Sequence, residues 1–254
     1  MATSVLPKYS SSDTSILGRK MTNDEIRVRF NAEVAEAYSQ RKPVWLPEYS
    51  YALGLVTKAL KPYLVAKQSA AVLDLGAGTG NLARRVLRAS RKSRLTLVDF
   101  SQNMLDDVPN VLKDFPGRYE VRQVDFWQAD FPSGQFDAVV SSFALHHGRG
   151  EAVYQAMYQK IHRWLKAPGI FVCCDVVEGD TPEIAALNEN GWRQYLSRRL
   201  SSEDVERMFS SYRREDSPIS LHKHLSFLDQ AGFEKVDVLW KRFNFAVYVG
   251  VREN

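Results

Sequence analysis

A short apolar run that ends in an acidic residue is followed by a loop with three alternating glycines and then by an amphipathic segment. The residues read Val72-Leu73-Asp74-Leu75-Gly76-Ala77-Gly78-Thr79-Gly80-Asn81-Leu82-Ala83. This order predicts a strand, a tight turn and a helix, which open a nucleotide-type site in an α/β fold. Glycine has no Cβ, so the backbone at Gly76 and Gly78 can turn sharply and lie against a ligand. The G-x-G-x-G spacing differs from the G-x-G-x-x-G that cradles a dinucleotide pyrophosphate, and it favours a related ligand without that group.

Length and composition favour one large α/β domain. The chain has 254 residues, of which 44% are hydrophobic and 25% charged, as is usual for soluble globular proteins. No apolar run approaches the roughly 20 residues that cross a bilayer, and the start of the chain lacks an apolar signal core. We therefore expect a cytoplasmic protein with no membrane association. Residues 1–20 are rich in serine and predict a flexible segment ahead of a single domain at 21–254.

Cysteine usage and net charge narrow the class further. Cys173 and Cys174 are adjacent in a predicted buried strand, so their side chains point to opposite faces and cannot pair with each other. Core packing in a reducing compartment is the favoured interpretation. The net charge of +4 is mild and permits an anionic substrate, but it does not indicate nucleic acid.

Hydrophobic periodicity predicts alternating strands and helices. Expected strands are 70–75, 94–99, 119–125, 136–141 and 170–176, and expected helices are 23–39, 48–60, 80–90, 103–112 and 150–166. The first helix begins at a capping box, Thr22-Asn23-Asp24-Glu25. Prolines predict an end to the second helix at Pro62, a cut or bend at Pro109, and an exit loop at Pro168-Gly169.

The alternation stops after the fifth strand. Residues 180–217 look helical and predict an insertion that covers the site. A helix at 220–230 and two strands at 236–240 and 243–251 follow, with only Lys241 and Arg242 between the strands. Such a short link favours an antiparallel hairpin. We therefore predict a doubly wound, Rossmann-like seven-stranded sheet with an antiparallel C-terminal hairpin strand, N-terminal helices and a helical lid insertion.

Four further motifs accompany the glycine loop in order. They are Leu97-Val98-Asp99-Phe100-Ser101-Gln102-Asn103-Met104-Leu105, Val124-Asp125-Phe126, the run from Phe136 to His147, and Ala231-Gly232-Phe233. With this set, the chain over residues 20–251 resembles the class I S-adenosylmethionine-dependent methyltransferases of small-molecule type. The resemblance implies S-adenosyl-L-methionine as cofactor.

The resemblance also implies roles for the adenosine side of the site. Asp99, at the end of the second strand, would accept the ribose hydroxyls. Phe100 and Met104 would sandwich the adenine, although Met104 could instead be helix core. Asp125 would accept from the adenine amino group beside the Phe126 backbone.

On the methionine side, the backbone of Gly76 would lie close to the cofactor, and Asp74 would reach its ammonium group through water. Ser142 is the small polar residue beside the methionine end. Upstream, Tyr38-Ser39-Gln40-Arg41 resembles a tyrosine-plus-arginine element of the family, but Ser39 replaces the usual aspartate. Arg41 could pair with the cofactor carboxylate or be a solvated helix-end cation.

His146 and His147, after the fourth strand, are the candidate proton acceptors, because histidine titrates near neutral pH. A structural or cofactor-adjacent role is the alternative. Solvated or packed roles are favoured for His222 and His224. Trp192, Tyr195 and Tyr212 could line an acceptor pocket or simply pack. The sequence has no zinc-type Cys/His spacing and no carboxylate cluster that would require a divalent ion, so no metal site is predicted.

The sequence thus predicts an enzyme that moves a methyl group to an oxygen, nitrogen or carbon of a small-molecule acceptor by in-line displacement. An RNA-modifying methyltransferase and a non-catalytic module that binds S-adenosylmethionine remain alternatives. The identity of the acceptor and the oligomeric state are left open.

Overall fold

The computed structural model describes residues 19–22, 24–26, 28 and 43–254. Most of the expected helix at 23–39, together with the candidate residues Tyr38 and Arg41, lies outside the described residues. The expected capping box is confirmed: the amide of Glu25 donates to Thr22 Oγ1 at 3.3 Å, and the amide of Thr22 donates to Glu25 Oε2 at 2.7 Å.

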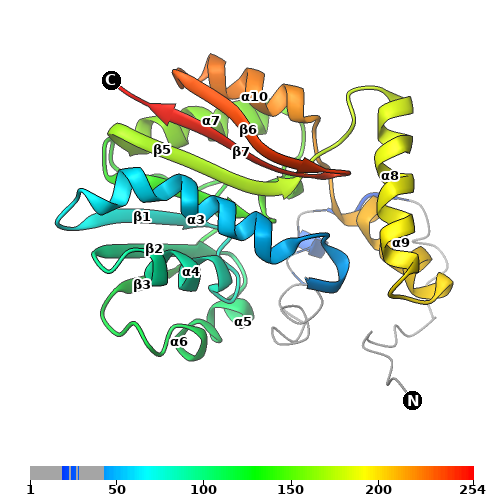
Figure 1. The fold of residues 1–254 in the computed structure, drawn as a ribbon, viewed down its shortest axis with the longest axis horizontal. Helices are drawn as coiled ribbons and strands as arrows, with labels where there is room; N and C mark the ends of the chain where they lie inside the picture. The colour runs from blue at the N-terminus through cyan, green and yellow to red at the C-terminus, as the bar shows by residue number, and fades with distance from the viewer. Residues whose placement is uncertain (1–18, 23, 27, 29–42) are drawn as a thin grey trace.

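A seven-stranded sheet forms the centre of the molecule, in the order β3-β2-β1-β4-β5-β7-β6 (Figure 1). The strands are β1 Ala70–Leu75, β2 Ser93–Asp99, β3 Tyr119–Gln123, β4 Phe136–Ser142, β5 Leu165–Val176, β6 Lys235–Arg242 and β7 Phe245–Arg252. Strands β1 to β5 are parallel where they pair with one another, and β7 pairs antiparallel to both β5 and β6. The predicted Rossmann-like architecture with a terminal hairpin is confirmed.

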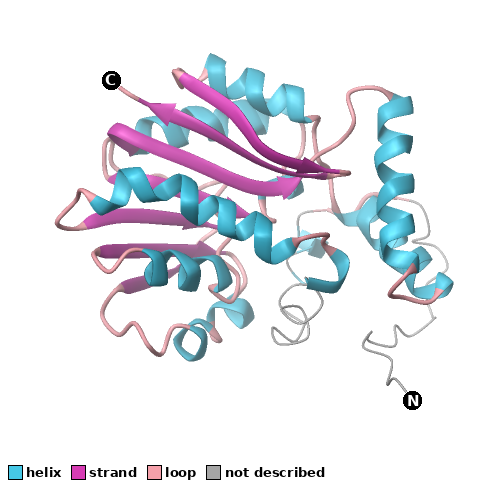
Figure 2. Cartoon of the chain, viewed as in Figure 1, coloured by secondary structure: helices cyan, strands magenta, loops and turns pink. Residues whose placement is uncertain are grey.

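Helices cover both faces of this sheet (Figure 2). The α-helices from Tyr49 onward are α3 Tyr49–Val65, α4 Asn81–Ala89, α5 Gln102–Leu105, α6 Val108–Val111, α7 Glu151–Trp164, α8 Pro182–Ser197, α9 Ser202–Glu215 and α10 Leu221–Gln230. A short 3-10 helix, η2, lies at Leu145–His147. Among the described residues no helix is long and apolar enough to cross a membrane.

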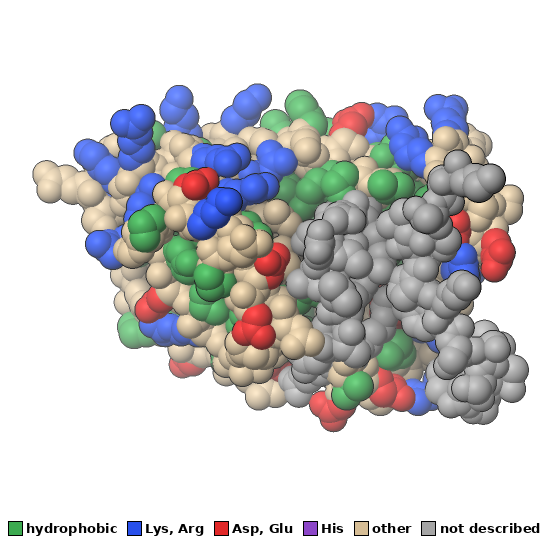
Figure 3. Space-filling model, turned by 90° about the horizontal axis from the view of Figure 1, so that it is seen from below, with side chains coloured by type: hydrophobic (Ala, Val, Ile, Leu, Met, Phe, Trp, Pro, Cys, Tyr) green, Lys and Arg blue, Asp and Glu red, His purple; other side chains and the backbone are tan. Residues whose placement is uncertain are grey.

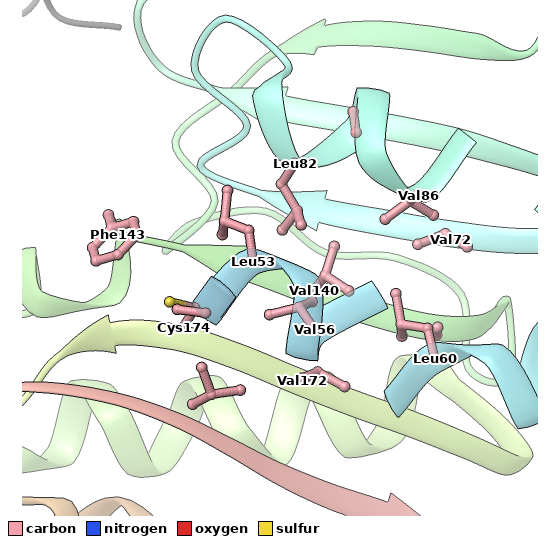
Figure 4. Packing of buried hydrophobic residues seen from close by; sticks show 14 of the residues in the cluster. Leu53, Val56, Leu60, Val72, Leu82, Val86, Val140, Phe143, Val172 and Cys174 are labelled. Atoms are coloured by element: carbon pink, nitrogen blue, oxygen red, sulfur yellow. The ribbon is translucent and has the colours of Figure 1, made fainter. Parts of the chain in front are cut away.

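The sheet separates two hydrophobic cores. On one face, Leu53 and Val56 of α3 pack against strand residues that include Val140 and Val172 (Figure 4). On the other face, residues of α7 and α10 form the second core. Cys174 belongs to the first core and Cys173 to the second, and both are buried cysteines outside any disulfide. The prediction that these neighbours point to opposite faces is confirmed.

The prediction that Pro62 ends the second helix is wrong, because α3 continues to Val65. Proline cannot donate the bond to the carbonyl four residues back, but Lys58, which carries that carbonyl, is exposed to water. Leu60 and Leu64, on either side of the proline, are both buried. The shared apolar face therefore keeps the last turn of α3 helical.

The predicted cut near Pro109 is confirmed. The expected helix at 103–112 is divided into α5 and α6, with Pro109 in the first turn of α6, where a missing amide costs nothing. Two other boundaries differ from expectation. β3 ends at Gln123 instead of 125. The expected exit loop at Pro168-Gly169 is wrong, because β5 already begins at Leu165, which pairs with Phe136 before the register shifts.

The segment predicted to be a helical insertion forms α8 and α9. In Figure 1 these two helices stand beyond the end of the sheet toward which β5 points. Ligands of open α/β sheets bind outside the carboxyl ends of the parallel strands. The two helices are therefore placed at the functional end of the sheet.

Candidate functional site

The glycine loop follows β1 and folds back against β2. The amides of Gly76 and Ala77 both donate to the carbonyl of Val98, at 2.9 and 3.0 Å. Gly76 and Gly78 have φ of +68° and +54°, a conformation that L side chains rarely adopt. A Cβ on Gly76 would lie 2.2 Å from the Cβ of Ala144, whereas a Cβ on Gly78 would meet no atom of the described residues within 4 Å. Gly76 is thus packed against the segment after β4, and none of the described residues fills the space beside Gly78.

Asp99 ends β2 and links that strand to the loop. Its Oδ2 accepts from the amide of Gly78 at 2.8 Å, and its Oδ1 accepts from the amide of Ser101 at 2.9 Å. The residue is buried. These two bonds fix the orientation of the carboxylate, which as a group can accept up to about four hydrogen bonds. The structure therefore places Asp99 beside the glycine loop, as the ribose role requires.

The residues assigned to the adenine follow β2 and β3 along the chain. Met104 in α5 and Phe126 after β3 are both buried. The ring of Phe126 approaches the loop, because a Cβ on Gly76 would lie 3.4 Å from its Cε1 atom. Asp125 accepts from the amide of Trp127 at 3.1 Å, which fixes its carboxylate in the turn. Phe100 is half-buried directly after Asp99.

The residues assigned to the methionine portion lie near the ends of β1 and β4. Asp74 is fully buried in β1. Ser142 is half-buried at the last position of β4. Nearby, Tyr49 opens α3, with its ring 5.8 Å from that of Phe143. Burial raises the pKa of Tyr49 to about 12, so its hydroxyl stays protonated at neutral pH.

His146 lies in η2 and is held by a buried carboxylate on the next strand. Its Nδ1 lies 2.5 Å from Oδ1 of Asp175, and its backbone amide donates to Asp175 Oδ2 at 3.1 Å. Asp175 is fully buried near the end of β5. Since a carboxylate only accepts, Nδ1 of His146 carries the hydrogen. The other ring nitrogen, Nε2, faces Asp216.

A second carboxylate faces both histidines from the opposite side. Oδ1 of Asp216 lies 3.6 Å from Nε2 of His146 and 3.5 Å from Nδ1 of His147. The two imidazole rings are 4.1 Å apart between centroids. The candidate proton acceptors therefore share one polar cluster, and we call His146, His147 and Asp216 the His–Asp cluster.

The segment that carries Asp216 is fastened to the β4 end of the sheet. The amide of Ser217 donates to the carbonyl of His146 at 2.8 Å, and the Tyr154 hydroxyl donates to the carbonyl of Ser217 at 3.0 Å. Arg149 donates to the carbonyls of Met21 and Glu215 at 2.7 and 3.2 Å. The position of Asp216 is thus set by bonds to its backbone neighbours.

The sequence reasoning placed Asp175 at a strand end but gave it no role, and it did not single out Asp216. Asp175 could have been found, because it falls at the carboxyl end of a predicted parallel strand. Asp216 carries no such signal, because it follows α9 in a stretch without strand periodicity.

The aromatic residues of the insertion pack instead of lining an opening. Trp192 is buried, with its ring 4.9 Å from those of both Phe209 and Phe245, and its Nε1 donates to the carbonyl of Trp45. Of the late histidines, His222 is exposed and His224 is fully buried, as the solvated or packed interpretation predicted.

Comparison with known proteins places this site in a family. The family model described as "Methyltransferase domain" matches residues 72–169, which hold the glycine loop, Asp99 and both histidines. The ubiquinone/menaquinone biosynthesis C-methyltransferase UbiE of Coxiella burnetii is 30% identical over 178 residues, covering 65% of this chain and 67% of the relative. The chain belongs to the class I S-adenosylmethionine-dependent methyltransferases. S-Adenosylmethionine is the cofactor of this methyltransferase.

Other relatives and structures agree with this assignment. The carboxy-S-adenosyl-L-methionine synthase of Nautilia profundicola is 21% identical over 229 residues, covering 90% of this chain and 96% of the relative. The structure of Haemonchus contortus phosphoethanolamine N-methyltransferase 2 with S-adenosylhomocysteine superposes with a TM-score of 0.64 at 15% identity, over 90% of this chain and 60% of that one. The latter likeness supports the fold of this methyltransferase.

The residues of the site fit the cofactor. Gly78 borders open space, where a side chain would otherwise meet a ligand, and the carboxylate of Asp99 is held beside it. Bare backbone on one flank and an acceptor for ribose hydroxyls on the other suit an adenosyl group. The glycine loop and Asp99 therefore have the geometry that an adenosyl group would need.

Proposed function

We propose that this methyltransferase transfers the methyl group of S-adenosylmethionine to an oxygen, nitrogen or carbon of a small-molecule acceptor. The observation that carries the proposal is the contact between the glycine loop and the segment before His146. Gly76 is packed so closely against Ala144 that a Cβ would lie 2.2 Å away. The backbone assigned to the methionine portion and the His–Asp cluster therefore belong to the same end of the site.

The chain's own residues divide the work between donor and acceptor. When bound, S-adenosylmethionine supplies an electrophilic methyl group on a sulfonium. Asp99 and the glycine loop fix the donor, with Asp125, Phe126, Met104 and Phe100 around the adenine. His146 and His147 contact the acceptor and assist the loss of its proton, where the acceptor must lose one. The remainder of the rate increase comes from alignment of the acceptor atom with the methyl group at near-attack distance and from exclusion of water.

We propose that α8 and α9 form the lid over the acceptor. Two of their basic residues are engaged within the lid itself: Arg213 pairs with Glu189 at 2.8 Å, and Arg199 stacks over Tyr195 at 3.9 Å. These two cations are therefore not arranged to collect an acidic substrate. The acceptor is recognised instead at the His–Asp cluster, of which Asp216 follows α9 directly.

The relatives support a small-molecule acceptor. The Coxiella relative is named for ubiquinone and menaquinone biosynthesis, and the Nautilia relative is named as a synthase of a modified S-adenosylmethionine. On the face drawn in Figure 3, basic side chains gather over the half of the molecule that carries α4, and further basic side chains lie at the opposite end of the same face.

A second candidate reaction follows from the length of one match. The carboxy-S-adenosyl-L-methionine synthase of Nautilia profundicola is covered over 96% of its length, so formation of a modified cofactor is the competing function. Mass spectrometry separates the two. Methyl transfer releases S-adenosylhomocysteine and a methylated acceptor, whereas the competing reaction yields a carboxylated S-adenosylmethionine.

The experiment that tests the proposal is a metabolite screen. Purified protein with S-adenosylhomocysteine is screened for further thermal stabilisation by small molecules, and each hit is assayed for methyl transfer from S-adenosylmethionine. We expect at least one hit to be methylated. Tight, salt-dependent tRNA binding would favour the RNA-modifying alternative. Cofactor binding without turnover on any hit would contradict the proposal and favour a non-catalytic module.

A further inference from the structure

The His–Asp cluster joins two segments that are far apart in the sequence. His146 and His147 come from η2, and Asp216 follows α9. One ligand atom from each residue, a ring nitrogen or a carboxylate oxygen, lies within 4.8 Å of the other two. All three side chains are mostly buried, with 7%, 16% and 15% of their surface exposed. The fold thus brings together three possible metal ligands that the spacing of the residues in the sequence does not reveal.

The separations between these atoms suit a common ion. Oδ1 of Asp216 lies 3.6 and 3.5 Å from the two histidine nitrogens. Histidine and carboxylate ligands bind Zn²⁺ at about 2.0–2.2 Å, so two ligands at a tetrahedral angle lie about 3.3–3.5 Å apart. A direct N–H···O hydrogen bond would instead bring nitrogen and oxygen to about 2.9 Å. The observed spacing is that of ligands around a central atom.

Asp175 supplies the supporting contact that metal-binding histidines require. A ligating histidine usually donates its other ring N–H to a carboxylate or carbonyl, which fixes the tautomer and the ring orientation. His146 does so here: Nδ1 lies 2.5 Å from the buried Asp175, and the nitrogen that faces Asp216 is Nε2. This contact is independent of Asp216 and points to the same coordinating atom.

The backbone holds the ligands in place before an ion arrives. The amide of Ser217, next to Asp216, donates to the carbonyl of His146 at 2.8 Å. The amide of His146 in turn donates to Asp175. Ligand-bearing segments that are bonded to one another lose little entropy on binding.

We propose that His146 Nε2, His147 Nδ1 and the carboxylate of Asp216 bind a divalent transition-metal ion, with Zn²⁺ as the favoured ion. Two histidines and one carboxylate leave a coordination position open, as in catalytic zinc sites. This inference rests on the proposed function, because the open position would bind the heteroatom of the acceptor. An ion lowers the pKa of a bound hydroxyl, so the proton is released to solvent. The oxygen lone pair then forms a bond to the methyl carbon as the carbon–sulfur bond breaks, and its electron pair leaves with neutral S-adenosylhomocysteine. The two histidines would then promote deprotonation of the acceptor by holding the ion.

The test uses the full chain, stripped of metal with a chelator and then titrated with Co²⁺ and Zn²⁺. We expect one Co²⁺ per chain, with the visible absorption of a low-coordinate site, and displacement of Co²⁺ by Zn²⁺. His147→Ala and Asp216→Asn remove ligands, and Asp175→Asn removes the orienting contact, which typically costs about 10–100-fold in metal affinity. His222→Ala and Asp180→Asn change exposed residues of the same types and should bind as the parent does.

Affinity for S-adenosylhomocysteine reports that each variant is folded, so loss of metal binding with retained cofactor binding supports the site. Equal metal affinity in the parent, His147→Ala and Asp216→Asn would overturn it, as would Co²⁺ binding without the visible band. Different results would contradict the metal site and the proposed function. Methyl transfer that persists undiminished in chelator refutes the metal site alone, whereas one bound ion without methylation of any acceptor refutes the proposed function alone.

Discussion

The carboxylate of Asp99 ties the end of β2 to the glycine loop, with its Oδ2 accepting from the amide of Gly78 at 2.8 Å. This bond spans the two neighbouring strands whose carboxyl ends form the cofactor site. It holds the carboxylate of Asp99 against the glycine loop, which is the position that the proposed ribose role requires.

Asp99→Asn should weaken cofactor binding while the fold persists. The change removes the negative charge of the side chain. It also replaces one carboxylate oxygen by an NH₂ group, which faces a backbone N–H and cannot accept its hydrogen bond. Each hydrogen bond to a charged group contributes about 1.5–3 kcal/mol, so losing one weakens S-adenosylhomocysteine about ten- to a hundredfold. Calorimetry measures the affinity, and Asp114→Asn, at an exposed site, is the matched control. Unchanged affinity in Asp99→Asn would refute the ribose role.

Two glycines of one loop should respond differently to alanine. In Gly76→Ala the new Cβ would collide with Ala144 at 2.2 Å, which adds an overpacking cost of about 1–3 kcal/mol to the left-handed strain of about 1–2 kcal/mol. In Gly78→Ala only the strain applies, because nothing lies within 4 Å. Thermal unfolding should therefore show Gly76→Ala as the less stable variant.

Cofactor affinity completes this comparison. The methyl group of Gly78→Ala points into the space assigned to the cofactor, so this variant should bind S-adenosylhomocysteine more weakly despite its milder loss of stability. If Gly78→Ala binds as tightly as the parent, the open space beside Gly78 is not the cofactor site.

Local patterns predicted the cofactor half of the site, whereas the acceptor half depends on tertiary contacts. Asp99 and Gly76 were predictable because each belongs to one strand–turn–helix unit, whose geometry is determined within a few residues. Asp216 was not, because its place beside His146 depends on the packing of α9 and on the bond from Ser217. The continuation of α3 beyond Pro62 was missed for the same reason, since the packing of Leu64 offsets the local penalty.

His224 should make stability depend on pH in mildly acidic solution. Complete burial lowers its pKa to about 4 from a model-peptide value of 6.5, and its Nδ1 lies 2.5 Å from the hydroxyl oxygen of Tyr158. Between these two pKa values the unfolded chain binds more protons than the folded one. The stabilising contribution is therefore complete above pH 6.5 and is lost as the pH falls toward 4, by at most about 1.4 kcal/mol per pH unit.

Chemical unfolding at several pH values measures this dependence. His224→Gln should flatten the slope between pH 6.5 and 4, whatever its effect on absolute stability. His222→Gln, at an exposed site, should retain the slope of the parent. A parent and a His224→Gln variant with the same slope would show that His224 does not titrate as its burial requires.

Trp192 should connect the stability of the insertion to that of the sheet. Its ring packs against Phe209 of α9 and also against Phe245 of β7, and its Nε1 donates to the carbonyl of Trp45 at 2.9 Å. Trp192→Ala opens a cavity that both elements share, and such truncations cost about 3–5 kcal/mol. Because the contact crosses from the insertion to β7, we expect one cooperative transition at lower temperature, monitored by circular dichroism and by calorimetry. Leu187→Ala, on the exposed face of α8, should change the midpoint little. A separate early transition confined to the insertion would show instead that α8 and α9 unfold as an independent unit.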